Sequence, residues 1–196
     1  MLEPISATTN MGNFNVTYLP TYAIDQSGLA APYISGVTAF TPYVSTTGTV
    51  SGGGSLNTWY SSANTTTGNF DFYLGVSHTI DAFVYWADPQ GVGQSVNSFQ
   101  LLADNNAAFS TATVLGTYTA QDGTGNANNS TNFGQVFQFA PVSATYVRMQ
   151  ILSNHGSTLT TAIVEGAFDA VPEPASLGIL GGVMLIGLRR GSRKQR

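Results

Sequence analysis

The sequence predicts an all-β protein: a jelly-roll-like β-sandwich followed by one short C-terminal transmembrane helix and a basic tail. The chain is rich in Gly, Ser, Thr and Asn and only 8% charged, a composition that suits short strands and turns better than exposed helices. Apolar and polar residues alternate in short runs that end at turn residues. An uncharged stretch at 175–188 directly precedes a cluster of cations, which indicates a membrane segment.

The 196 residues divide into three segments. Residues 1–12 have neither the cationic nor the apolar region of a secretory signal, and we expect them to be disordered or the remnant of a truncated N-terminus. Residues 13–169 suffice for one sandwich domain with its own core. Residues 170–196 form the tail, with the transmembrane helix at about 175–188 and the basic end at 189–196.

Charge is distributed unevenly along the chain. In residues 1–188, ten acids against the single base Arg148 leave a net charge of −9, and five cations after residue 188 bring the chain to −4. An acidic body with one cation lacks the electrostatic footprint of a nucleic-acid-binding protein. Cysteine is absent, which excludes disulfides, a thiolate nucleophile and a cysteine-based metal site.

Strands are expected wherever the alternation is regular. Phe14, Val16 and Tyr18 alternate with polar residues, as in a half-buried strand, whereas Pro20, Pro32 and Pro42 punctuate a loop or edge strand. Segments 113–118 and 135–139 flank a polar loop and are expected to pair as a long hairpin. The expected strands cover residues 14–18, 70–74, 80–86, 98–102, 113–118, 135–139, 144–152 and 161–168.

The same alternation assigns side chains to the core. Successive strand residues point to opposite faces, so every second residue of a half-buried strand is apolar. The pattern predicts six inward side chains: Phe70, Phe72, Leu74, Val147, Met149 and Ile151.

A series of landmarks follows one order along the body: an Asp-containing loop, Trp-x-Ser, an aromatic strand ending in Leu-Gly, a Tyr-Val-Arg strand and a late strand with Glu. They lie at residues 24–29, 59–61, 72–75, 146–148 and 163–166, with a further strand at 99–104. In this order they resemble the discoidin, or coagulation-factor type-C, domain of the galactose-binding jelly-roll fold. The resemblance spans about residues 25–168 and implies that fold.

Aromatic residues near loops are the candidate ligand contacts, because the C–H faces of a pyranose are flat and apolar. Trp86 ends an expected strand just before a loop, and Tyr43 lies in the Pro-rich stretch. We select both as candidate sugar contacts, with burial in the core as the alternative for Trp86. Trp59 matches a family position that is usually in the core.

The resemblance also implies a metal site. Related sandwiches bind one structural calcium through an Asp of the early loop and a Glu of the late strand, which correspond here to Asp25 and Glu165. Calcium prefers such oxygen ligands, and a carboxylate within an apolar strand needs a compensating cation. Arg148 is the alternative partner for the buried acid, since a salt bridge would satisfy it without metal.

The tail has three parts in a fixed order. Val171, Pro172, Glu173 and Pro174 precede the apolar stretch, and Arg189 and Arg190 follow it as a membrane stop. This order resembles the PEP-CTERM sorting signal of Gram-negative and related bacteria. The resemblance implies export, recognition by an exosortase and membrane anchoring through the helix until it is removed.

The sequence carries no catalytic motif such as Gly-x-Ser-x-Gly or His-Glu-x-x-His. We therefore expect an exported, non-enzymatic protein of the cell surface or extracellular matrix that binds carbohydrate. Its expected partners are the exosortase and polysaccharide. The alternatives are a structural surface protein without a small ligand and a secreted hydrolase with spatially paired acids.

Overall fold

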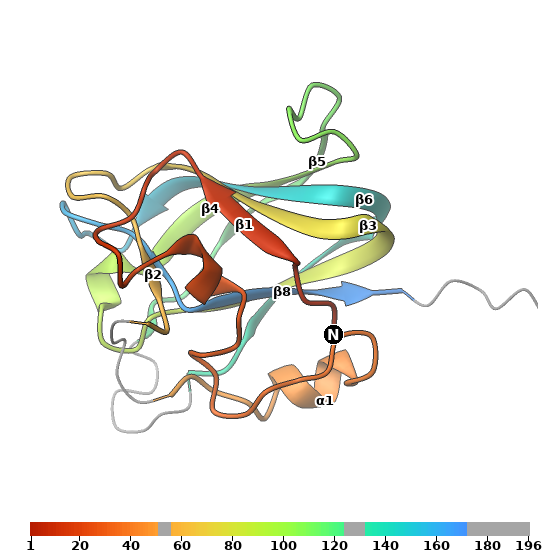
Figure 1. Ribbon diagram of the computed structural model, residues 1–196, viewed down its shortest axis with the longest axis horizontal. Coiled ribbons are helices and arrows are strands. Elements are labelled where there is room, and N and C mark those ends of the chain that lie inside the picture. The colour runs from red at the N-terminus through yellow and green to blue at the C-terminus, as the bar shows by residue number, and fades with distance from the viewer. Residues whose placement is uncertain (51–55, 124–131, 172–196) are drawn as a thin grey trace, which may run out of the picture.

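The computed structural model describes residues 1–50, 56–123 and 132–171. Its strands form one six-stranded sheet and one two-stranded ladder, all antiparallel (Figure 1). The sheet runs β1 (Ser6–Thr9), β3 (Gly68–Trp86), β6 (Gln135–Asn154), β4 (Val96–Asp104) and β5 (Thr113–Thr119), and β8 (Glu165–Ala170) also pairs with β3. The ladder joins β2 (Trp59–Tyr60) to β7 (Ala162–Ile163). The all-β, sandwich-like prediction is confirmed.

Strands β3 and β6 are long enough to contribute to both layers of the sandwich. The first part of β3 lies between β1 and the second part of β6, whereas its last part lies between β8 and the first part of β6. The register between β3 and β6 shifts between Tyr73 and His78. Two pairs of expected strands are therefore each part of one long strand. Residues 70–74 and 80–86 both belong to β3, and residues 135–139 and 144–152 both belong to β6.

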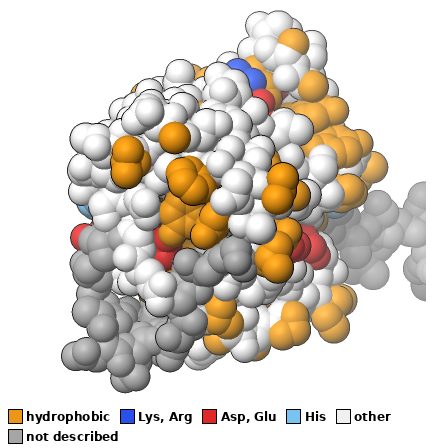
Figure 2. Space-filling view, turned by 60° about the vertical axis from the view of Figure 1, so that its left-hand side comes forward, with side chains coloured by type: hydrophobic (Ala, Val, Ile, Leu, Met, Phe, Trp, Pro, Cys, Tyr) orange, Lys and Arg blue, Asp and Glu red, His pale blue; other side chains and the backbone are white. Residues whose placement is uncertain are grey.

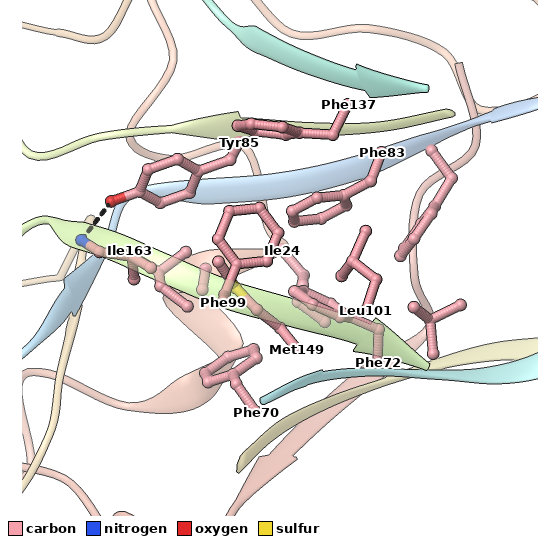
Figure 3. Close-up of a cluster of buried hydrophobic side chains, with 14 of the residues drawn as sticks. Ile24, Phe70, Phe72, Phe83, Tyr85, Phe99, Leu101, Phe137, Met149 and Ile163 are labelled. Carbon is pink, nitrogen blue, oxygen red and sulfur yellow. Dashed lines mark hydrogen bonds between the residues drawn. The ribbon is translucent and has the colours of Figure 1, made fainter. Parts of the chain in front are cut away.

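The core fills the space between the layers with aromatic side chains (Figure 3). The Phe72, Phe83 and Phe168 rings lie 5.2–5.5 Å apart between centroids. All six side chains predicted to point inward are at most 2% exposed, which confirms the assignment of faces. Trp59 is fully buried, in agreement with the family position.

The N-terminal residues are ordered, contrary to the expectation of disorder for residues 1–12. β1 pairs with β3 from Ser6 to Thr9, and Leu2 exchanges backbone hydrogen bonds with Phe168. Met1, Leu2 and Met11 are buried, so apolar packing adds to these hydrogen bonds.

Two other expectations about strands are wrong. Residues 14–18 form turns, and Phe14 is 53% exposed. The segments 113–118 and 135–139 do not form a hairpin, because β5 pairs with β4 and the first part of β6 pairs with β3.

The Pro-rich stretch forms loops with two short helices, η1 (Pro20–Ala23) and α1 (Phe40–Val44). A third short helix, η2 (Val92–Gln94), follows β3.

The expected transmembrane helix at 175–188, the membrane stop and the sorting motif after Val171 lie outside the described residues. Within the part of the chain that the structure describes, no helix is long and apolar enough to cross a membrane. The membrane segment therefore stays a prediction from sequence.

Candidate functional site

A pocket of about 260 Å³ lies where three loops meet beside β2. Figure 2 turns this end of the molecule forward and shows hydrophobic side chains grouped among polar ones. Loops on a rigid sandwich are the usual place for binding residues. We call this cavity the loop pocket; it is lined by Phe14, Tyr18, Tyr60, Gln94, Leu159 and Thr160.

Three aromatic rings form one wall of the loop pocket. Tyr18 lies edge-to-face with both Phe14 and Tyr60, at centroid distances of 6.1 and 4.8 Å. The Phe14 amide donates to the Tyr60 carbonyl at 2.9 Å, and Trp59 Nε1 donates to the Gly12 carbonyl at 2.9 Å. The turn that carries Phe14 and Tyr18 is thus held against β2.

Tyr60 is held from behind by an acid. Its hydroxyl donates to Oδ2 of the fully buried Asp88, whose Oδ1 accepts the Gln90 amide at 2.9 Å. Burial and the adjacent Asp88 carboxylate raise the pKa of the Tyr60 hydroxyl. Gly91 permits this packing, because an added Cβ would lie 3.0 Å from the Tyr60 hydroxyl and closer still to Asp88.

The opposite wall comes from the loop between β6 and β7. Leu159 is 56% exposed, whereas Thr160 is 2% exposed and its Oγ1 has no hydrogen-bond partner among the described residues. Ser157 Oγ accepts from the Leu159 and Thr160 amides, and Asn154 Nδ2 donates to the Thr160 carbonyl. An unpaired buried hydroxyl costs stability, so Thr160 is a group for which a ligand can supply the missing partner.

These features combine apolar faces with polar groups in one small cavity. Exposed Phe14 and Leu159 can cover the C–H face of a small polar ring, and Tyr60 has a fixed orientation. The Thr160 hydroxyl and the Gln94 amide can exchange hydrogen bonds with hydroxyl groups. Such a mixture is typical of sites for small polar ligands with apolar faces.

The two predicted sugar contacts are not at this pocket. Trp86 is fully buried, and its Nε1 donates to the Thr47 carbonyl at 3.0 Å. Tyr43 covers Trp86 from α1, with ring centroids 6.3 Å apart, and its hydroxyl bonds to the Ala31 carbonyl. The Pro-rich stretch packs over Trp86, so the alternative of burial holds and neither ring can stack on a sugar.

A second polar centre surrounds Glu165 at the start of β8. Its side chain is fully buried; Oε2 accepts the Gln26 amide at 3.0 Å, whereas Oε1 has no hydrogen-bond partner in the described structure. The buried Tyr33 hydroxyl likewise makes no hydrogen bond of normal geometry there, but it faces Glu165 and interacts with its carboxyl group. Burial raises the pKa of the Glu165 carboxyl well above its usual value. The Gln26 amide and the Tyr33 hydroxyl oppose that rise, and the Asp25 and Glu3 carboxylates add to it.

The alternative partner for Glu165 is engaged elsewhere. Arg148 Nε and Nη2 donate to Asp71 Oδ1 and Oδ2 at 2.7 and 2.8 Å, so the hypothesis of an Arg148–Glu165 salt bridge is wrong. Glu165 Oε1, which makes no hydrogen bond of normal geometry with a described residue, and nearby Asp25 are oxygen ligands of the kind that calcium prefers. Within the described residues, no three His, Cys, Asp or Glu side chains are grouped to hold a metal, so an ion would also need other oxygens, such as backbone carbonyls.

Sequence reasoning missed most of the loop pocket. Phe14 and Tyr18 belong to an apolar–polar alternation that is typical of a strand. Leu159 and Thr160 lie in a polar segment that contains no recognisable motif. One feature of the sequence could have pointed to these two aromatic residues. Tyr60 and Phe14 both lie in segments rich in Asn, Ser and Thr, and these residue types favour turns. Aromatic residues in such turns are more exposed than those in regular strands.

The sequence matches the F5/8 type C domain over residues 37–165, which is more than half of the chain. No curated protein matches it. Three similar solved structures cover most of both chains. A chitosan-binding module of a Paenibacillus sp. IK-5 chitosanase/glucanase has a TM-score of 0.56 at 15% identity and covers 86% of this chain and 96% of its own.

The other two structures come from Clostridium perfringens. CBM32-3 of a family 31 glycoside hydrolase has a TM-score of 0.57 at 15% identity, with 86% of this chain and 90% of that chain covered. The family 32 module of NanJ, solved with galactose, has a TM-score of 0.53 at 14% identity, with 83% and 91% covered. At such low identity these similarities establish the fold.

Proposed function

Because this chain belongs to the F5/8 type C domain family, we propose that it is a non-catalytic carbohydrate-binding domain whose sugar occupies the loop pocket. The observation that carries the proposal is a cavity walled by Phe14, Tyr18 and Tyr60, whose lining includes Thr160, a residue with a buried hydroxyl that has no partner among the described residues. A pyranose matches both features, because its C–H face can lie on an aromatic ring while its hydroxyls pair with Thr160. One similar solved module is named for binding chitosan, and another was solved in complex with galactose.

The pocket lining supports binding without hydrolysis. Glycoside hydrolases generally place two carboxyl groups on either side of the scissile bond. None of the described residues that line the loop pocket is acidic, and the nearest acid in contact, Asp88, is fully buried behind Tyr60. This arrangement disfavours the alternative of a secreted hydrolase.

The test is a titration of the purified chain with a chitosan hexamer and, separately, with β-galactobiose, in which calorimetry measures the binding. We expect Phe14→Ala to weaken binding about tenfold, since covering a phenylalanine side chain contributes about 1.5 kcal/mol or more. Ile34→Ala is the matched control: Ile34 is 66% exposed and does not line the pocket. Equal affinity of the Phe14→Ala variant and the parent would exclude the loop pocket as the sugar site. No binding of either sugar would favour the alternative of a structural surface protein without a small ligand.

A structural calcium at Glu165 completes the proposed domain. Glu165 and Asp25 would hold the ion with other oxygen ligands, and the ion would supply the positive charge that the buried carboxylate lacks. It would tie the early loop to the start of β8, as the Gln26 amide already does. Its role is to stabilise the fold.

We also propose that the domain acts outside the cell. The sorting motif from Val171 to Pro174, the apolar stretch at 175–188 and the stop at Arg189 and Arg190 support export, processing by an exosortase and transient membrane anchoring. Intact-mass measurement on protein from its native host tests this. A mature chain that lacks residues 175–196 is expected, and a full-length chain in the soluble cytoplasm contradicts the proposal.

A further inference from the structure

A second pocket, of about 270 Å³, lies on the outer face of the sheet. Across β3 and β6, Tyr73 pairs with Tyr146 and Asp71 pairs with Arg148, and apart from Thr145 their neighbours in the strands are buried core residues. The edge strand β1 adds Ser6 and Thr8, in register with Tyr73 and Asp71. We call this cavity the sheet pocket; it is lined by Ser6, Thr8, Asp71, Phe72, Tyr73, Ala107, Phe109 and Tyr146.

Two tyrosine rings form an aromatic surface in the sheet pocket. The Tyr73 and Tyr146 rings are stacked, with centroids 5.0 Å apart and planes 25° apart. The Tyr73 hydroxyl donates to the Gly75 carbonyl at 2.7 Å, which fixes its orientation. Because the two rings stack on each other, their facing sides are covered, and a partly apolar ligand in the pocket would meet the ring edges.

A third ring comes from the loop between β4 and β5, which projects from the sandwich beside the β5 label in Figure 1. Phe109 packs edge-to-face with Tyr146, at a centroid distance of 6.5 Å, and its φ is +52°, a left-handed conformation uncommon for an aromatic residue. Asp104 accepts the amides of Asn106 and Thr111 and holds the loop at both ends. Backbone in such a conformation concentrates at functional sites, because the surrounding structure must hold it in place.

A charged pair lies beside the sheet pocket: Asp71 lines the pocket, and its partner Arg148 is not among the lining residues. Arg148 donates twice to Asp71, and its guanidinium carbon lies 4.1 Å from the centre of the Phe109 ring. Both side chains are about one-fifth exposed. Arg148 fixes both Asp71 carboxylate oxygens, which keep lone pairs that can accept from sugar hydroxyls. The pair carries no net charge, so it favours a polar ligand over an anion.

We propose that the sheet pocket is a second carbohydrate-binding site, which takes one neutral or amino pyranoside. The sugar ring packs against the edges of Tyr73 and Tyr146 beside Phe109, and its hydroxyls bond to Asp71 and to the Ser6 hydroxyl. The acidic body disfavours a uronic acid. The sheet pocket shares no residue with the loop pocket, so it does not depend on the first site, and one domain can hold two glycan chains.

The test is a titration of the full isotope-labelled chain, followed through backbone amide shifts, with a chitosan hexamer and separately with β-galactobiose. We expect shifts at Tyr73, Phe109 and Tyr146 with at least one sugar, and their persistence in the Phe14→Ala variant. Phe109→Ala is expected to weaken this site about tenfold, because the sugar loses one aromatic wall. Val114→Ala, at a 55% exposed position of β5 outside the pocket, is the control.

The two sites can fail separately. Shifts confined to the loop pocket overturn the second site and leave the first. If neither sugar shifts the backbone amides at the sheet pocket, the second site is overturned, whatever shifts occur elsewhere in the domain. Shifts at the sheet pocket that keep the same affinity in the Phe109→Ala variant also overturn the proposed site, provided that its melting temperature matches the parent.

Discussion

The backbone amide of Gln26 donates a hydrogen bond to Glu165 Oε2 at 3.0 Å, across 139 positions of sequence. This contact ties the early loop to the start of β8. It leaves the other carboxylate oxygen of Glu165 buried without a hydrogen bond of normal geometry in the described part of the chain, although the Tyr33 hydroxyl faces the carboxyl group. Arg148, the single cation before the tail, is committed to Asp71, so the site lacks a protein cation.

Calcium is therefore expected to stabilise the domain through Glu165. At a calcium concentration 100 times its dissociation constant, the gain is about 2.7 kcal/mol, or roughly 5–10 °C in melting temperature. Glu165→Gln should abolish the gain, because a neutral amide is a weaker calcium ligand. Differential scanning calorimetry with calcium and with chelator measures it, and identical midpoints for the parent chain would refute the site.

Thr160→Val separates binding from stability. Removing an unpaired buried hydroxyl is expected to leave the free energy of unfolding unchanged or raise it by about 1 kcal/mol, whereas sugar affinity should fall about tenfold. Thr49→Val is the matched control, since Thr49 Oγ1 is also buried without a partner in the described residues but lies outside the loop pocket. Equal sugar affinity of both variants would exclude Thr160 as a ligand contact.

Gly91→Ala is expected to distort the loop pocket. The new Cβ would lie 3.0 Å from the Tyr60 hydroxyl and would overlap Asp88 and Gln94. We expect a loss of about 1–3 kcal/mol in stability and weaker sugar binding. Gly93→Ala in the same turn is the control, because its Cβ would come no closer than 3.4 Å to any atom. Urea unfolding measures the stability and calorimetry measures the sugar affinity. If the Gly91→Ala and Gly93→Ala variants have the same stability and the same affinity, the prediction is contradicted.

Alkaline pH should destabilise the core through Tyr85. Its buried hydroxyl accepts the Val96 amide at 3.0 Å (Figure 3) and donates to the Ala162 carbonyl at 3.3 Å. Burial raises the pKa of this hydroxyl above its ordinary 10.0. A raised pKa means that the folded state favours the neutral form, so this stabilisation is complete below pH 10 and is lost as pH rises toward the higher value.

The matching variant is Tyr85→Phe. At pH 8 it should lose about 1–3 kcal/mol, because the buried Val96 amide is left unpaired. Above pH 10 the difference from the parent should shrink, since phenylalanine does not ionise. Urea unfolding at both pH values tests this, with Tyr22→Phe in η1 as the control. A difference that stays constant with pH would show that Tyr85 does not cause the alkaline loss.

The period-two pattern predicted the core faces of β3 and β6, because alternation is a local property of an extended chain. Phe70, Phe72 and Met149 are buried as the pattern requires. The same pattern failed at Phe14 and Tyr18, where alternation occurs in a turn. Local periodicity does not reveal whether a neighbouring strand is present to pair with the segment.

The sequence by itself determined the acidic body, the absence of cysteine, the all-β class and the apolar tail with its cations, because these follow from composition and from local order. Only the tertiary structure decided that Phe14, Tyr60 and Thr160 line one pocket, that Trp86 is covered, and that Arg148 meets Asp71 instead of Glu165. The register between β3 and β6 selects that partner. Register depends on the packing of the whole core, so the linear order of charges does not specify it.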